Sequence, residues 1–245
     1  MVRVSLDDLV AFSGHQLHVC RFREARTLLR WLGNDLRGQV VLDVAGGDGY
    51  WAGQARRRGA RTVSVDLALH KLRRGRRLRS SPALVAGDAL RLPLSDASVD
   101  AVLSVCALEH FPDGPAALTE MVRVLRPGGQ LLLSADALTR RHRWPNLAQT
   151  HRRRYDVRRT YTHTQLRELL TSRGVVVGEH RYQFRGPGAE LGYLAVSAWG
   201  GRLGFNAAAP AIPLVAASDA IRRNDRGSIV LLRARKPSET EGEPS

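Results

Sequence analysis

The chain has 245 residues, of which 43% are hydrophobic, and this is enough to form an α/β domain with a substantial core. Its formal charge is +15 at pH 7, because 38 basic residues face 23 acidic ones. Such an excess favours an acidic partner, for example RNA, anionic lipid or a phosphorylated substrate. The two cysteines exclude a disulfide framework and a cysteine-rich metal cluster.

The sequence predicts no segment directed to a membrane. Asp7 and Asp8 interrupt any signal-peptide pattern at the start. The least polar run, 207–217, contains two prolines and is far shorter than the roughly 20 apolar residues of a spanning helix. We therefore expect a cytoplasmic protein. Arginines flank this run, so contact with the surface of an anionic membrane stays open as an alternative.

Residues 1–38 are expected to form a helical cap. Apolar residues recur there at spacings of three and four, which places them on one helix face. They are Phe22, Ala25, Leu28, Leu29, Leu32 and Leu36.

From residue 39 the pattern alternates between strands and helices, which is typical of a parallel sheet covered on both faces. The predicted strands are 40–44, 62–66, 83–86, 99–105, 130–134, 175–178 and 228–234. Helices are predicted over 50–58, over the basic stretch that ends near residue 79, and around the apolar stripe 118–125. A further helix is expected to be capped by Thr164 and to stop at Gly174.

Three segments depart from this alternation. Residues 136–163 are rich in Arg and His and are expected to form an inserted loop or lid. Residues 181–227 form an insertion before the last strand, rich in Gly, Ala and aromatic residues. The polar tail 236–245 is expected to be disordered. The core domain is therefore predicted to run from 39 to 235.

The stretch 41–49, VLDVAGGDG, predicts a nucleotide-binding loop at the end of the first strand. Glycine allows the sharp turn and the close approach of a ligand to the backbone. Residues 47–52 also fit the G-x-G-x-x-G/A pattern of dinucleotide-binding loops, with Asp66 near the place of a ribose-binding acid.

Three features argue against a nicotinamide enzyme. Asp43 would repel a pyrophosphate at this turn, whereas it would favour an ammonium or sulfonium group. Asp88, after the third strand, is placed to accept a hydrogen bond from an adenine amine. No tyrosine lies four residues ahead of Lys71 or Lys236, the only lysines, so a Tyr-x-x-x-Lys pair is missing.

With these motifs the chain resembles the class I S-adenosylmethionine (SAM)-dependent methyltransferases of the small-molecule type. The resemblance covers about residues 39–136 and is carried by five motifs in order. They are 41–49, the strand 63–66, 86–89 with Leu92 and Pro93, 98–102 followed by 108–110, and 125–131.

The resemblance implies a Rossmann-like three-layer α/β sandwich. Its seven-stranded sheet would be mostly parallel, with the last strand antiparallel and beside the fifth. It also implies SAM as cofactor, which carries an activated methyl group on a sulfonium. Asp43 would lie near the methionine end, Asp66 on the ribose and Asp88 by the adenine. The expected cofactor contacts are Asp43, Ala45, Gly46, Gly47, Gly49, Asp66, Leu67, Asp88, Ala89 and Val105.

Ala45 is the one departure from the family pattern, which usually has glycine there. A Cβ at this position is a small obstruction in the loop. An alternative function is therefore that of a scaffold that binds SAM or its product S-adenosylhomocysteine (SAH) without catalysing methyl transfer.

His110 is the candidate general base, because it follows the fourth strand at the edge where ligands bind. The alternative is a loop histidine that shapes the pocket or caps Asp113. Candidates for the acceptor pocket lie in the N-terminal segment, the lid and the second insertion. They are His15, His18, His151, Tyr155 and Tyr193. No metal site is expected, because no cysteine or carboxylate supports the His15-x-x-His18 spacing.

The predicted function is O-, N- or C-methylation of a small or medium-sized organic acceptor such as a secondary metabolite. An RNA methyltransferase is an alternative that the charge favours, but 104–108 lacks the Pro-Pro-aromatic motif of base-modifying enzymes. A lipid or quinone methyltransferase at the membrane and a homodimer joined through the second insertion are further alternatives.

Overall fold

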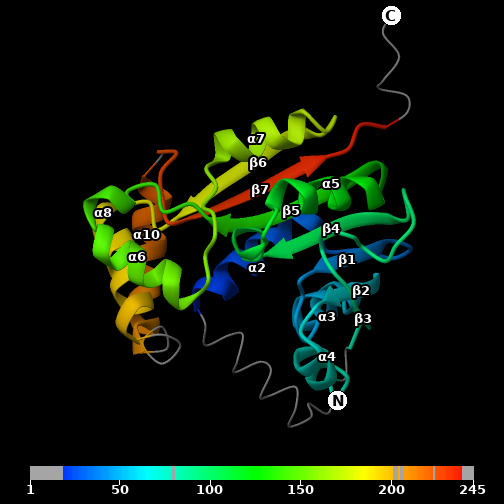
Figure 1. Cartoon of the computed structure of the whole chain (residues 1–245), viewed down its shortest axis with the longest axis horizontal. Helices are drawn as coiled ribbons and strands as arrows, with labels where there is room; N and C mark the ends of the chain where they lie inside the picture. Colours follow the sequence, from blue (N-terminus) through cyan, green and yellow to red (C-terminus); the bar gives the residue numbers. More distant parts are fainter. Residues whose placement is uncertain (1–18, 79–80, 201–203, 205–206, 223, 239–245) are drawn as a thin grey trace, which may run out of the picture.

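The computed structural model describes residues 19–78, 81–200, 204, 207–222 and 224–238. Within them, seven strands form one sheet in the order β3-β2-β1-β4-β5-β7-β6 (Figure 1). Of the six neighbouring pairs, β7 runs antiparallel to both β5 and β6, and the other four pairs are parallel. The strands are β1 Val40–Val44, β2 Arg61–Asp66, β3 Ala83–Ala86, β4 Val99–Val105, β5 Leu125–Asp136, β6 Val176–Gln183 and β7 Ile229–Arg235.

Helices cover both faces of the sheet, which gives three layers (Figure 1). They are α2 Val19–Leu32, α3 Tyr50–Arg56, α4 Leu69–Gly75, α5 Gly114–Val124, α6 Pro145–Arg154, α7 His163–Thr171, α8 Pro187–Ala195 and α10 Ile212–Ile221. Short 3-10 turns span Leu108–His110, Arg141–Arg143 and Ala209–Ala211, and a π-helical turn spans Val196–Gly200. No described helix combines the length and the apolar character needed to cross a membrane.

The core has two parts, one on each face. On one face, α5 and α7 bury residues such as Leu118 and Leu166 against β4, β5 and β7. On the other face, α2, α3 and α8 bury Leu28, Trp51 and Leu194. The predicted fold class is therefore confirmed, including the antiparallel last strand beside β5.

The order of the sheet also fixes where a ligand can bind. The chain moves outward through β1, β2 and β3 and then returns to β4 on the other side of β1. At such a reversal the loops after β1 and β4 diverge, and this opens a crevice at the carboxyl ends of the strands.

Several boundaries differ from the sequence prediction. α2 ends at Leu32, and Leu36 is buried from the following loop rather than from a helix. Residues 136–163 contain the helix α6 in place of the expected irregular lid. The predicted cap of α7 at Thr164 is wrong. Thr162 is the N-cap, because its hydroxyl accepts from the Gln165 N–H while the Gln165 side chain accepts from the Thr162 N–H.

The second insertion is held to the sheet by buried ion pairs. Arg140 Nη1 lies 3.0 Å from Glu190 Oε2, and this joins the loop after β5 to α8. Asp219 of α10 accepts from Arg23 Nη2 at 3.0 Å and from the N–H groups of Phe184 and Arg185. These contacts fix α8 beside the carboxyl end of β5, and α10 beside α2 and the end of β6. In the polar tail, residues 239–245 lie outside the described residues.

Candidate active site

The loop after β1 has the backbone shape that its glycines predict. Gly47 and Gly49 have φ angles of 63° and 73°, and Ala45 adopts the same left-handed region with φ 56°. A Cβ on Gly46 would lie closer than 3 Å to Ser64 Oγ and to the Asp43 carboxylate. The loop is thus packed directly onto β1 and β2, and only glycine fits at position 46.

Asp43 lies beneath this loop and does not line the cavity. It is 1% exposed, and its Oδ2 accepts from the Ala52 N–H at 3.3 Å. Burial raises the pKa of Asp43 to about 8, because the charged form loses its hydration. Its negative charge would therefore be favoured only when a cation lies nearby.

A cavity of about 650 Å³ opens at the carboxyl ends of β1, β2, β3 and β4, a size typical of small-molecule sites. Six of the predicted cofactor residues line it, together with the predicted base His110 and with Tyr155. The six are Ala45, Asp66, Leu67, Asp88, Ala89 and Val105. Gly46, Gly47 and Gly49 lie in the adjoining loop, outside the lining.

The two carboxylates of the cavity are held by backbone N–H groups. Asp66 accepts from Gly47 at 2.8 Å and from Ala68 at 2.7 Å, and Asp88 accepts from Leu90 at 2.9 Å. Each carboxylate keeps further lone pairs for a ligand. Leu67, directly after Asp66, is 70% exposed, so a large apolar side chain faces the cavity without a protein partner covering it.

Charged side chains also gather where the cavity meets α2 and β4. Ser134 Oγ donates to Glu24 Oε2 at 3.0 Å, and the Cys106 thiol donates to Glu109 Oε1 at 2.9 Å. Burial raises the pKa of Glu24 to about 8 and raises the pKa values of Glu109 and Cys106 as well. Burial opposes the charge of Arg21, but the neighbouring Cys106, Glu24 and Glu109 together raise its pKa.

Sequence reasoning missed this cluster. Arg21 lines the cavity, and Glu24 is 1% exposed. Arg21 stands four residues before Ala25 and Glu24 four residues before Leu28, so charged residues on the apolar face of α2 were the available signal. Cys106 Sγ and the carboxylates of Glu109 and Asp136 lie within 4.8 Å of one another. The short spacing from Cys106 to Glu109 did not reveal that β5 brings Asp136 to the same place.

His151 and Tyr193 meet at Asp136 instead of lining the cavity. His151 Nε2 lies 2.6 Å from Asp136 Oδ2, and its Nδ1 lies 2.8 Å from Ser197 Oγ. The Tyr193 hydroxyl donates to Asp136 Oδ1 at 3.1 Å. This buried network ties α6 and α8 to the end of β5. Of the other acceptor-pocket candidates, Tyr155 lines the cavity, and His15 and His18 lie outside the described residues.

His110 is positioned with one ring nitrogen free to act. Its Nδ1 lies 3.2 Å from the carbonyl oxygen of Asp156. A carbonyl only accepts, so Nδ1 carries the hydrogen and the neutral ring keeps its lone pair on Nε2. Nε2 lies 3.9 Å from Glu109 Oε1. Asp113 instead caps α5 by accepting from the Ala116 N–H.

Residues 42–133 match the family model described as "Methyltransferase domain". This segment is therefore similar to a methyltransferase domain. The matched segment runs from β1 into β5 and holds the loop, both cavity carboxylates and His110. The methyltransferase family implies SAM as cofactor, and the residues present fit it. The cavity offers carboxylates for hydroxyl and amine groups, a cationic Arg21 and the uncovered Leu67 for a flat base.

Curated relatives match less than half of the chain. The chain is 41% identical over 97 residues to a demethylmenaquinone methyltransferase of Beutenbergia cavernae, covering 40% of each protein. It is 36% identical over 112 residues to a malonyl-[acyl-carrier protein] O-methyltransferase of Serratia marcescens, covering 46% of this chain and 44% of the relative. The chain therefore spans less than half the length of these relatives.

Solved structures share the whole fold of the methyltransferase at lower identity. One is the putative methyltransferase of Haloferax volcanii in complex with the Trm112 activator. It has a TM-score of 0.66 and 20% identity, and the match covers 97% of this chain and 100% of that one. At this identity the likeness concerns the fold alone.

Proposed function

We propose that this methyltransferase transfers the methyl group of SAM to an oxygen or nitrogen of a small or medium-sized organic acceptor, such as a secondary metabolite. The observation that carries the proposal is the cavity at the ends of β1 to β4, lined by Asp66, Asp88 and His110. The candidate cofactor residues and the candidate base thus line one and the same cavity.

The chain's own residues divide the work by chemistry. Asp66 would accept from the ribose hydroxyls, and Asp88 from the adenine amine, beside Ala89 and Leu67. Arg21 is a partly buried cation of the cavity lining that can hold the carboxylate of the methionine moiety. SAM supplies a methyl group already activated on a sulfonium, so the protein's main tasks are to position the acceptor and to exclude water.

His110 would act on the acceptor. When the acceptor is a hydroxyl, His110 Nε2 would accept its proton as the methyl group is transferred. The hydrogen bond from Nδ1 to Asp156 keeps the ring in the tautomer that this role needs. A neutral amine acceptor needs no base before transfer and loses its proton afterwards.

Transfer of labelled methyl groups tests the proposal. The protein is incubated with methyl-tritiated SAM and either a bacterial small-molecule extract or total tRNA. We expect label in the organic fraction, and His110→Gln should lower its rate of incorporation about 100-fold for a hydroxyl acceptor. The affinity for SAH should stay unchanged, because His110 is assigned to the acceptor. Label in tRNA alone would contradict the proposal in favour of an RNA substrate.

A further inference from the structure

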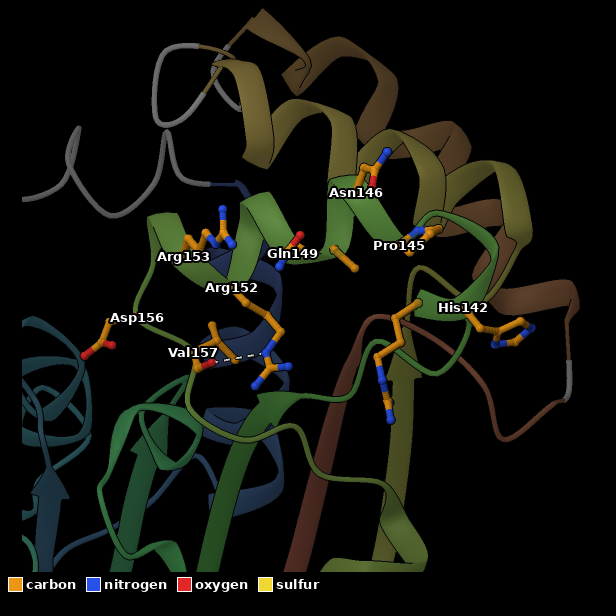
Figure 2. Close-up of a pocket in the computed structure, with 10 residues that line it drawn as sticks. His142, Pro145, Asn146, Gln149, Arg152, Arg153, Asp156 and Val157 are labelled. Atoms are coloured by element: carbon orange, nitrogen blue, oxygen red, sulfur yellow. Dashed lines mark hydrogen bonds between the residues drawn. The ribbon is translucent and has the colours of Figure 1, made fainter.

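A second hollow, of about 720 Å³, lies under α6 and adjoins the cofactor cavity (Figure 2). Asp156 lines both, so the two spaces meet at the loop after α6. The hollow is lined by side chains that donate hydrogen bonds. They are Arg141, His142, Asn146, Gln149, Arg152 and Arg153.

The arginines of this hollow keep their charges uncompensated. Figure 2 shows Arg152 reaching from α6 toward Val157, where its Nε lies 3.3 Å from the carbonyl oxygen. Its Nη2 donates to the carbonyl oxygen of Arg158 at 3.0 Å. Carbonyls carry no net charge, so Arg152 remains a full cation that faces the hollow.

The same holds for its neighbours. Among the described residues, neither Arg141 nor Arg153 lies within 4.0 Å of a carboxylate oxygen. Asp156 is the only acid in the lining, and its Oδ2 lies 3.7 Å from Arg158 Nε. Three arginines therefore line this space against one carboxylate that already has a partner.

The helix α6, which bears Arg152 and Arg153, also reaches the active site. His151, next to Arg152 in α6, turns inward to Asp136 at the end of β5. The loop 155–158 that follows α6 contributes Tyr155, Asp156 and Arg158 to the cofactor cavity. A group held under α6 is thus held beside the place where methyl transfer is proposed to occur.

We propose that this hollow binds a phosphate or diphosphate group of the methyl acceptor, so that the acceptor is a phosphorylated metabolite. This inference rests on the proposed methyl transfer. Guanidinium groups present paired N–H donors that match phosphate oxygens, and the amides of Asn146 and Gln149 add uncharged donors. The position predicts that the phosphate end sits under α6 while the methylated end reaches His110.

Binding of pyrophosphate tests the hollow directly. Isothermal titration is done on the full chain saturated with SAH, so that the cofactor cavity is closed to the anion. The test variant is Arg141→Gln with Arg153→Gln, which spares Arg152 and its backbone contacts. The control is Arg56→Gln with Arg57→Gln, which removes the same charge at the exposed end of α3.

We expect one pyrophosphate per chain for the wild type and at least tenfold weaker binding for the test variant. The control should change the affinity less than twofold. No saturable binding to the wild type, or equal losses in the two double variants, would overturn the proposal. So would single-stranded RNA binding that depends on Arg141 and Arg153 while pyrophosphate binding does not.

A second arm separates a phosphorylated metabolite from free phosphate. Phenyl phosphate should bind at least as tightly as inorganic phosphate, since its ring has room in the adjoining cavity; selective binding of inorganic phosphate would contradict the proposal. SAH binding is measured on its own beforehand. Failure to bind SAH would sink the proposed function, whereas the pyrophosphate titration without SAH would still decide whether the hollow holds an anion.

Discussion

Ala45 is the residue at which this chain departs from the methyltransferase pattern that it resembles, and the structure shows the consequence. Its φ of 56° is a conformation that L-residues avoid, because Cβ approaches the following carbonyl oxygen. The loop therefore keeps the shape that a glycine would give it, at a cost in stability. The alanine at position 45 therefore raises the energy of the backbone but does not prevent the cavity from forming.

Ala45→Gly should therefore stabilise the protein by about 1 kcal/mol. The substitution removes the backbone strain, and the greater entropy of glycine in the unfolded chain offsets only part of this gain. Urea unfolding monitored by circular dichroism measures the change. Ala116→Gly in α5 is the matched control and should lose about 0.5–1 kcal/mol, as glycine does in a helix. A loss of stability in both variants would mean that Ala45 is unstrained.

The position of Asp43 was predicted from the sequence only in part. The spacing of Asp43, Asp66 and Asp88 predicted three acids at one sheet edge, and the structure confirms that place. It could not show that Asp43 lies under the loop, because burial depends on packing by Ser64 and Ala52, which come from other elements.

Asp43 should make stability depend on pH. Its pKa is raised to about 8 in the folded state and is near 4 when unfolded, so the folded protein holds an extra proton between these values. The free energy of unfolding must then fall as pH rises from about 5 to about 8, and Glu24 adds to the fall. Asp43→Asn should make this slope shallower by up to about 1.4 kcal/mol per pH unit.

Urea unfolding at pH 5, 6, 7 and 8 checks this slope. Asp35→Asn is the control, because the exposed Asp35 has a pKa lowered by its hydrogen bond with Arg37 and titrates below this range. An unchanged slope in Asp43→Asn would show that Asp43 is ionised when the protein folds.

At the scale of elements, the number and places of the strands were predictable, but several boundaries were not: β5 and β6 extend well beyond the predicted 130–134 and 175–178. Buried parallel strands such as 40–44 and 99–105 can be recognised in the sequence as mainly apolar runs. α6 was hidden, because Arg and His dominate it and only Ala148 and His151 are buried. The two residues lie three apart, too few to form an apolar stripe.

The start of α7 gives the sharpest test at this scale. Thr162→Ala should cost about 1 kcal/mol, because it breaks the capping box with Gln165. Thr164→Ala should change stability little, since this exposed residue sits inside the first turn, where alanine is a better helix former. Thermal unfolding of the two variants measures the difference. Equal effects would contradict the observed cap.

Over the whole molecule, the alternation of strands and helices predicted the mostly parallel sheet. The resemblance carried by the five motifs implied the antiparallel last strand beside the fifth and the cofactor. The arrangement of the acceptor side could not be predicted, because it depends on contacts between segments distant in sequence, such as those of Asp136 with His151 and Tyr193. Part of the +15 charge is concentrated at one place, because three arginines without a carboxylate partner among the described residues line the hollow under α6.

The central claim, a SAM site at the ends of β1 to β4, is tested most directly by titration with SAH. Two variants change the cavity and one matched variant does not. Asp66→Asn removes a charged acceptor, and Leu67→Ser removes an apolar side chain that is 70% exposed and whose loss should leave folding intact. Asp35→Asn makes the same change as the first on the exposed surface.

We predict one SAH per chain in the wild type and in Asp35→Asn, binding about 10- to 100-fold weaker in Asp66→Asn, and binding several-fold weaker in Leu67→Ser. Their melting temperatures without ligand serve to exclude unfolding. Absence of SAH binding to the folded wild type, or equal affinities in all four proteins, would contradict the claim.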